Sequence, residues 1–337
     1  MTSKSKSTCL VADIGGTNAR FALIDIDGVE PRHTRVLACS DYHTLVDAVL
    51  AYIEDAAVDM PAQASFAIAT PVSHDRIVMT NHVWDLSVDD TRNKLGLSTL
   101  KVINDYTALS LALPYLQTDD YRQVGGGSCA DRQTMAVIGP GTGLGVSGAV
   151  YTGSYWLPLQ GEGGHVAYNP ADEREEEIFT QIRKRRDFVS AESIVSGPGL
   201  VLLYESISKL KDEHHRLATP ETITRDALAG SSASAKEALD MMCGVLGAVA
   251  GDLALTLGAR GGVYIGGGII PRIGKFIDAS PFRHRFESKG RFTDYVSEIA
   301  TRVIVSEFPA LTGAAIAMRP HYDGLGCTSH HGDNTSV

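Results

Sequence analysis

Cysteine is scarce in this sequence, and its few copies are not arranged to bind metal or to cross-link the chain. Only five of the 337 residues are cysteine, an odd number, and no two of them form a C-x-x-C pair. We therefore expect neither a disulfide framework nor a structural zinc site. Unpaired thiols fit a reducing compartment, so a cytoplasmic location is predicted.

Basic charge is in short supply as well. Lys and Arg number 30 against 40 Asp and Glu, which gives a formal net charge of -10. Nucleic acids recruit basic faces, so this balance argues against nucleic acid as a partner. The one basic cluster, Arg183–Arg186, follows the acidic run Asp172–Glu177. Together they predict the solvated surface of one helix.

Long uninterrupted hydrophobic runs are missing too. The first eight residues are polar, so we expect no signal peptide. The most apolar stretch, residues 241–259, contains Asp252 and four glycines. It predicts a buried helix, and no membrane partner is expected. Residues from about 321 to 337 are polar and rich in Gly, His and Ser, which predicts a disordered tail.

Glycine is abundant, and two of its clusters share one pattern. Asp13–Asn18, here called the first glycine turn, lies between the apolar runs Cys9–Ala12 and Phe21–Ile24. A strand, not a helix, is predicted after it, and the sequence contains no GKS or GKT. Rossmann and P-loop nucleotide sites are therefore not expected. A glycine pair between two apolar runs is, by itself, most often a simple hairpin.

The second glycine turn, Gly139–Gly145, repeats this order between Met135–Ile138 and Val146–Tyr151. Two such hairpins predict two similar halves facing each other across a cleft, with phosphates held by backbone N–H groups. The first turn resembles the first phosphate loop of the actin, Hsp70 and hexokinase superfamily. A third glycine turn, Gly266–Gly268, follows another apolar strand.

The periodicity around these turns predicts alternating strands and helices. In the first half the expected order is three strands, a helix over about 42–57, and further strands at 65–69 and 101–105. In the second half we expect helices over about 173–186, 190–209, 223–229 and 234–257. A helix at 311–318 closes the pattern.

Polar residues at two places suggest chemistry. Asn104 and Asp105 follow a predicted strand, where an α/β sheet presents its functional groups. Asp105 either caps the following helix or accepts a proton from an attacking hydroxyl. Asn104 offers both a donor and an acceptor, which suits a sugar hydroxyl.

Gly161–His165 is a glycine-rich loop with one acid and one histidine. Glu162 and His165 lie three residues apart and suit the binding of vicinal hydroxyls better than zinc, for which no third ligand is evident. Glu192 follows in Ser190–Gly199. It either favours the N-terminus of a helix capped by Ser190 or binds a ligand. The Ser-Gly-Pro-Gly turn after it predicts a kink between helices.

These segments together resemble the bacterial-type, ATP-dependent glucokinase family, in particular its enterobacterial members, over about Thr8–Arg319. The segments that carry the resemblance are Asp13–Arg20, Met79–His82, Ile103–Asp105, Gly139–Gly145, Gly161–His165, Ser190–Gly199, Gly266–Arg272 and Lys289–Phe292. The zinc-binding cysteine cluster of the related ROK proteins is absent, and Pro140 is a minor departure from some members.

The resemblance implies an α/β protein with the two-domain actin-like ATPase (ribonuclease H-like) fold and a central cleft. A small domain would comprise residues 8–114 and about 306–320, and a large domain residues 115–305. We also expect a homodimer.

The resemblance further implies that ATP phosphorylates the 6-hydroxyl of D-glucose, with Asp105 as the general base. Asn104, Glu162, His165 and Glu192 would bind the sugar. Nucleotide-binding positions would be Ala12, Asp13, Ile14, Gly15, Gly16, Thr17, Asn18, Gly141, Thr142, Gly143, Gly266, Gly267 and Gly268. Asp13 would lie near Mg²⁺ through water.

Three other functions stay open at this point. One is a kinase for another hexose, such as mannose or a glucosamine. Another is a sugar-sensing regulator that binds without turnover, although an intact Asp105 and two intact glycine turns speak against it. The third is an actin-like filament protein, which would have no use for Glu162 and His165.

Overall fold

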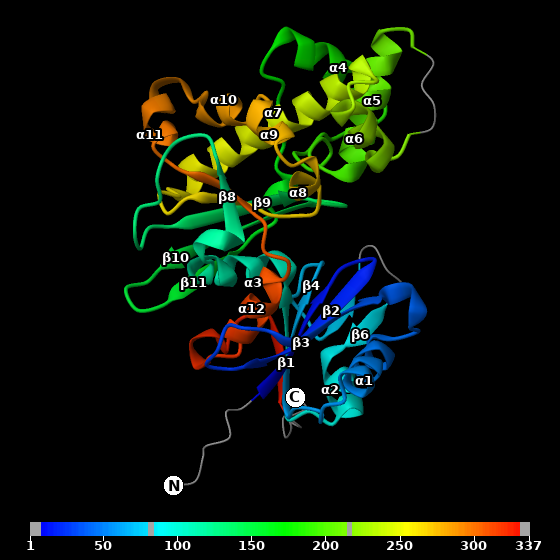
Figure 1. Ribbon diagram of the computed structural model, residues 1–337, viewed down its shortest axis with the longest axis vertical. Coiled ribbons are helices and arrows are strands. Elements are labelled where there is room, and N and C mark those ends of the chain that lie inside the picture. The colour runs from blue at the N-terminus through cyan, green and yellow to red at the C-terminus, as the bar shows by residue number, and fades with distance from the viewer. Residues whose placement is uncertain (1–7, 80–83, 214–217, 331–337) are drawn as a thin grey trace. The chain divides into compact units, whose positions relative to one another are not determined.

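The computed structural model describes residues 8–79, 84–213 and 218–330 of an α/β protein with mixed sheets (Figure 1). Contacts between Cα atoms divide the chain into two compact units. The first comprises Met1–Leu116, Thr152–Gln160 and Ser306–Val337, and the second Gln117–Tyr151 and Gly161–Val305. Residues 152–160 thus group with the first unit, whereas the predicted boundaries put them in the large domain. Residues 80–82 of the predicted Met79–His82 segment lie outside the described residues.

The first unit is built on a sheet with strand order β14-β7-β4-β1-β2-β3. Its elements are β1 (Thr8–Ile14), β2 (Asn18–Asp25), β3 (Arg32–Ala38), α1 (Leu45–Ala56), β4 (Gln63–Ile68), β5 (Arg76–Val78), β6 (Asp85–Ser87), α2 (Val88–Leu95), β7 (Thr99–Asn104), α3 (Asp105–Ala112), β11 (Trp156–Gln160), α12 (Pro309–Ile316) and β14 (Cys327–His330), with 3-10 turns η1 (Cys39–Asp41), η2 (Leu113–Tyr115) and η6 (Pro320–Tyr322). The predicted order of three strands, a helix and a strand is observed at β1 to β4.

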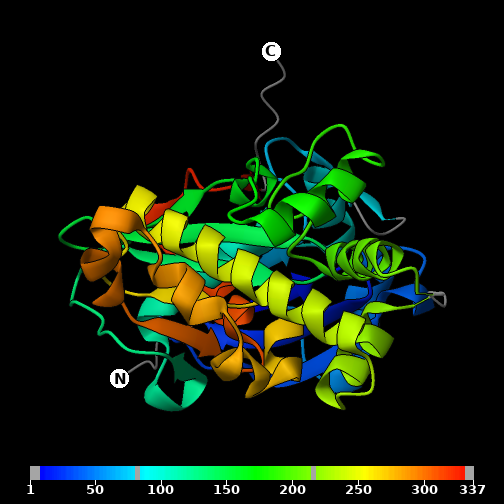
Figure 2. The same ribbon diagram turned by 90° about the horizontal axis from the view of Figure 1, so that it is seen from above.

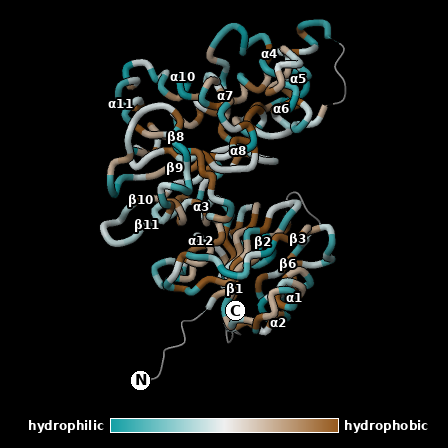
Figure 3. Tube along the Cα trace, viewed as in Figure 1, coloured by the Kyte–Doolittle hydropathy of each residue, from teal (hydrophilic) through white to brown (hydrophobic). Residues whose placement is uncertain are grey.

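Helices cover both faces of this sheet. Leu10 and Ala12 of β1 pack in one cluster with residues of α1 and α2. Cys9 and Val11, which alternate with them, pack in another cluster with residues of α3 and α12. A strand buried on both faces reads as a continuous apolar run, and the hydropathy-coloured trace shows this run as brown strands (Figure 3).

The second unit contains strands in the order β10-β9-β12-β13-β8. Its elements are η3 (Thr118–Asp120), β8 (Tyr121–Val124), β9 (Met135–Pro140), β10 (Leu144–Tyr151), η4 (Gly163–His165), α4 (Glu173–Arg183), α5 (Gly197–Leu210), α6 (Pro220–Leu228), α7 (Ala233–Leu257), β12 (Val263–Ile265), α8 (Ile269–Ile273), α9 (Phe276–Ala279), α10 (Phe282–Glu287), η5 (Gly290–Phe292), α11 (Thr293–Ser297) and β13 (Thr301–Ile304).

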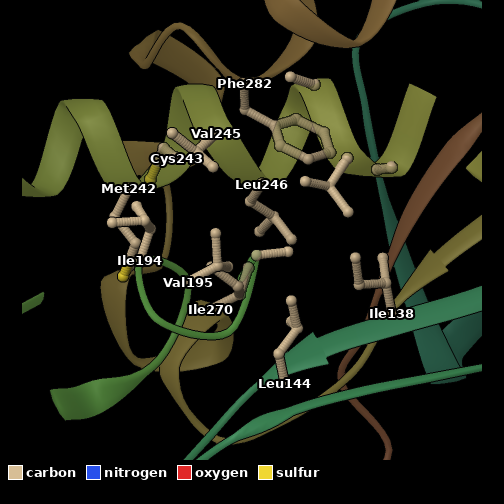
Figure 4. Close-up of a cluster of buried hydrophobic side chains, with 14 of the residues drawn as sticks. Ile138, Leu144, Ile194, Val195, Met242, Cys243, Val245, Leu246, Ile270 and Phe282 are labelled. Carbon is tan, nitrogen blue, oxygen red and sulfur yellow. The ribbon is translucent and has the colours of Figure 1, made fainter. Parts of the chain in front are cut away.

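The long helix α7 is the centre of the second core. It is the one helix among the described residues that is long and apolar enough to cross a membrane, and 72% of its most apolar window is buried. Figure 2 shows it as the long yellow helix lying across the second unit. Its side chains Met242, Val245 and Leu246 pack against Phe282 and against strand residues (Figure 4). It is therefore a core helix, as the interrupted apolar pattern predicts.

Two predictions of local structure are wrong. The tail is not disordered up to residue 330, because Cys327–His330 forms β14 and pairs antiparallel with β7. An edge strand is held by backbone hydrogen bonds, so its polar composition did not signal order. The helix predicted from Ser190 begins only at Gly197, because Pro198 has no N–H to donate to a preceding turn and favours the first turn of a helix.

Candidate functional site

In the first unit, polar groups gather at the carboxyl ends of three parallel strands. The registers align Ile14 of β1 with Ile68 of β4 and Ile68 with Asn104 of β7. Asp13 comes one residue before this row and Asp105 one residue after it. Two strand spacings separate β1 from β7, about 10 Å. The predicted acids of the first glycine turn and of the β7 end therefore belong to one edge of one sheet.

Asp105 is the first residue of α3, and two donors hold one oxygen of its carboxylate. Its Oδ1 accepts hydrogen bonds from Tyr106 N and from Asn104 Nδ2, both at 2.9 Å. Burial and the nearby Asp13 carboxylate raise the pKa of Asp105 to about 7, and the two hydrogen bonds oppose that rise. A carboxylate that is fixed in place and has a pKa near 7 suits proton transfer.

The helix cap is Asn104, so the alternative of Asp105 as the N-cap is wrong. Asn104 Oδ1 accepts hydrogen bonds from Tyr106 N at 2.9 Å and Thr107 N at 3.1 Å. Its amide group donates to Asp105 and, at 3.3 Å, to the carbonyl oxygen of Thr70. Asn104 thus fixes the start of α3 and the orientation of the Asp105 carboxylate. Its predicted contact with sugar stays a prediction.

The first glycine turn closes the hairpin between β1 and β2. Gly15 N donates to Asn18 O at 3.0 Å, and Thr17 is exposed at the tip. Ala12 and Ile14 have fully buried side chains, so only their backbone is left for a ligand. Asp13 pairs with Arg20 directly across the hairpin, with 3.1 Å between Oδ2 and Nη1.

Arg20 is a site residue that the sequence analysis missed. Burial raises the pKa of Asp13, and the positive charge of Arg20 opposes this effect. A two-residue turn at Gly15 and Gly16 would place Asp13 opposite Asn18, whereas the observed register pairs Ile14 with Ala19 and Asp13 with Arg20. The glycine pair therefore did not give the register that brings these two side chains together.

The second glycine turn is held by partners outside its own hairpin. Gly141 N donates to Gly143 O, and Gly141 O accepts from Gly197 N at the start of α5, both at 2.8 Å. Leu144 N donates to Glu192 Oε2, also at 2.8 Å. Thr142 is exposed. The turn is therefore fixed by α5 and by one carboxylate side chain.

The structure brings His165 and Glu192 together. His165 Nδ1 lies 3.9 Å from Glu192 Oε1, and Glu192 N donates to Gly164 O at 2.8 Å. Glu162 precedes the turn η4 and is exposed. The alternative of Glu192 in a helical first turn is wrong, because Ser190–Ser196 precedes α5 and Ser196 caps that helix. The hydrogen bond from the Leu144 N–H to the Glu192 carboxylate could not be predicted from the sequence.

The third glycine turn lies beside the second. Gly266 N donates to Ile138 O of β9 at 2.9 Å. Gly267 has a φ of +75°, and a Cβ there would lie 2.3 Å from Pro140 O. Gly268 follows at the start of α8, and an added Cβ there would meet nothing within 4 Å. The two turns predicted to bind phosphate and adenosine thus adjoin each other in the second unit.

The described residues contain no group of three or more His, Cys, Asp or Glu side chains that could bind a metal ion by themselves. The first unit contains two neighbouring carboxylates beside a glycine turn, and the second unit contains two glycine turns together with Glu162, His165 and Glu192. Carboxylates near backbone donors suit transfer of an anionic group to a hydroxyl.

Comparison with known proteins gives the same family as the sequence motifs. The sequence profile described as "Glucokinase" matches residues 10–321. A glucokinase of Aromatoleum aromaticum is 51% identical over 92% of this chain and 94% of its own. One from Neisseria meningitidis is 47% identical over 93% and 95%.

Solved structures of glucokinases also superpose on this chain. A glucokinase from an Antarctic psychrotroph superposes with a TM-score of 0.82 at 32% identity, covering 92% of this chain and 98% of that one. A ROK-family glucokinase from Streptomyces griseus, solved with glucose and AMPPNP, superposes at 0.62 with 19% identity, covering 91% and 98%; it shows likeness of fold. The resemblance is confirmed, and the chain belongs to the glucokinase family.

Proposed function

We propose that the protein transfers the γ-phosphoryl group of ATP to the 6-hydroxyl of D-glucose, giving glucose 6-phosphate, the first step of glycolysis. Family membership supports the reaction, and the Streptomyces relative was crystallised with glucose and an ATP analogue. The observation that carries the proposal is Asp105. Its carboxylate is fixed at the end of β7, has one oxygen engaged by two donors, and has a pKa raised to about 7.

Asp105 acts as the general base. It accepts the proton of the 6-hydroxyl as that oxygen attacks the γ-phosphorus, and the bond to the β-phosphate oxygen breaks. A base whose pKa lies close to the working pH combines a large ionised fraction with a useful driving force for proton transfer. Asn104 positions the carboxylate through its 2.9 Å hydrogen bond.

Both glycine turns hold phosphates through backbone N–H groups, and the third turn lies against adenosine. Asp13 has its Oδ2 paired with Arg20, and its Oδ1 would hold Mg²⁺ through a water. Kinase, ATPase and polymerase sites bind Mg²⁺ through one or two carboxylates together with substrate phosphates, which this arrangement fits. When bound, Mg²⁺ neutralises negative charge on the phosphates.

Glu162, His165 and Glu192 bind the remaining sugar hydroxyls, together with Asn104. The proximity of His165 to Glu192 supports this, because an imidazole and a carboxylate 3.9 Å apart present a donor and an acceptor to neighbouring hydroxyls. Glu162 is exposed and lies in the same loop.

We further propose that the two units are the domains of an actin-like ATPase fold with a central cleft, in a cytoplasmic homodimer. A substrate that contacts groups on both domains favours the state in which they approach. Small-angle scattering should therefore give a smaller radius of gyration with saturating glucose than without it. An unchanged curve would reject closure.

The substrate is tested by an ADP-release assay with ATP, Mg²⁺ and a panel of glucose, mannose and glucosamine. The proposal expects glucose to give the highest kcat/KM. A higher value for mannose or glucosamine would make this a kinase for that hexose. Glucose binding without ADP release would make it a sugar sensor.

A further inference from the structure

We infer that Glu192 is a positioning residue that links the sugar site to the second glycine turn, so that glucose binding strengthens ATP binding. The inference rests on the proposed function, since it assigns a second role to one of the sugar-binding residues.

The link begins at the glycine turn. Glu192 Oε2 accepts the Leu144 N–H at 2.8 Å, where the turn enters β10. The carboxylate also passes close to the backbone of the turn, because a Cβ at Gly143 would lie 2.5 Å from Oε2. A glycine at 143 therefore leaves the space that this carboxylate occupies. The bond from Leu144 N to Glu192 therefore links the glycine turn to a side chain that is predicted to bind sugar.

The other end of the link is the sugar loop. Glu192 Oε1 lies 3.9 Å from His165 Nδ1, and the Glu192 backbone N–H donates to Gly164 O at 2.8 Å. One carboxylate thus uses one oxygen toward the glycine turn and the other toward the sugar residues. A hydroxyl bound at Oε1 fixes the side-chain torsions that also place Oε2.

The segment that carries Glu192 is rigid enough to transmit this effect. Ile194 and Val195, two and three residues after Glu192, are fully buried in the core that includes α7, and Leu144 is almost fully buried there (Figure 4). Gly197 N then holds Gly141 O at 2.8 Å, independently of the carboxylate. With both backbones fixed, the Glu192 side chain is the adjustable part between sugar and turn.

Coupling of this kind is reciprocal, so it is measured as one ratio. Calorimetry gives the Kd of AMPPNP with Mg²⁺, in the absence and in the presence of saturating glucose. In the parent protein glucose should lower the AMPPNP Kd by about fivefold or more. Four variants, one of them a control, separate the two roles of Glu192 from sugar binding in general.

Glu192→Asp shortens the side chain by about 1.5 Å and should break the bond to Leu144 N. Its AMPPNP Kd without glucose should rise about tenfold, and glucose should no longer lower it. Gly143→Ala should reproduce this result by displacing the carboxylate. Glu192→Gln keeps a neutral acceptor of roughly half the strength and should partly restore the coupling.

His165→Ala is the matched control, because it removes a sugar partner and leaves the bond to Leu144. It should weaken glucose binding, keep the AMPPNP Kd without glucose, and retain the coupling when glucose is saturating. Retained coupling in both Glu192→Asp and Gly143→Ala would overturn the inference alone. A parent protein that does not bind glucose would overturn the proposed function and this inference together.

Discussion

The two glycine turns share one sequence pattern but are supported in different ways. The first is held by its own bond from Gly15 N to Asn18 O and by Cys39, whose N–H donates to Thr17 O at 2.9 Å, and it lies beside the charged Asp13, Arg20 and Asp105. The second is hydrogen-bonded to Gly197 and to Glu192, and its Pro140 lies close against the backbone of Gly267. Under the proposed function, these similar strand-turn-strand sequences would serve different tasks: the first unit would supply charge for the chemical step, and the second a fixed, backbone-lined surface for substrates.

This difference predicts that substitutions in the second unit act on substrate binding. Glu162→Gln and His165→Ala should lower kcat/KM for glucose by about 10²-fold, because a substrate hydroxyl loses its partner. The KM for ATP should change by less than about threefold if the loop serves the sugar alone. Steady-state kinetics with each substrate varied in turn provides the test. A larger effect on ATP would assign the loop to the nucleotide.

Glycine substitutions sharpen the contrast between the first glycine turn and the third, which lies against the second. Gly267→Ala places a side chain at a φ of +75° and 2.3 Å from Pro140 O. It should cost about 2–4 kcal/mol of stability. At Gly15 a Cβ would lie 3.5 Å from Asn18 O, an ordinary contact. Gly15→Ala should therefore cost less than about 0.5 kcal/mol, and any loss of ATP affinity would come from the ligand side. Urea unfolding of both variants measures the difference, and equal losses would contradict it.

Ionisation of the Asp105 carboxylate in the first unit should also lower the free energy of unfolding. The pKa of Asp105 is raised to about 7 from 3.8, so the folded state holds a proton that the unfolded state has lost between these values. Stability should fall as pH rises through this window. Asp105→Asn removes the cost and should be more stable than the parent at pH 8, on the order of 2 kcal/mol, with a small difference at pH 4. Thermal unfolding at both pH values tests this, and a variant less stable at pH 8 would refute it.

The same ionisation should appear in catalysis. Since the base must be deprotonated, kcat/KM of the parent should fall about tenfold per pH unit below an apparent pKa of about 7. A pH–rate profile with ATP and Mg²⁺ saturating provides the measurement. A profile flat from pH 5 to pH 8 would show that no group with this pKa limits the reaction.

Much of the local structure of the candidate site could be predicted from the sequence, because it depends on residues that are neighbours in the chain. The glycine turns, the acids at strand ends and the order of strands and helices are encoded by neighbouring residues. The start of α5 was missed because Ser190 and Glu192 match the pattern of a capped helix start, so that Pro198 predicted only a kink between helices. The strand β14 was missed because its order comes from pairing with β7, more than 200 residues earlier in the chain.

The partners of the site residues were harder to predict. The pairing of Arg20 with Asp13 depends on the hairpin register, which the position of the glycine pair did not give. The bond from Leu144 N to Glu192 links residues 48 apart through a backbone donor, which every residue possesses. Whether Asn104 or Asp105 caps α3 depends on where the helix begins. The two alternatives differ by one residue, which is within the ordinary error of helix boundaries.

The most direct test of the account is the turnover of Asp105→Asn. This variant keeps the shape of the side chain and removes the base. The account predicts a fall in kcat of about 10²-fold or more in a coupled glucose 6-phosphate assay, with the glucose Kd within about threefold of the parent. A kcat within threefold of the parent would show that Asp105 is not the base and would remove the first unit's assigned role in the chemical step.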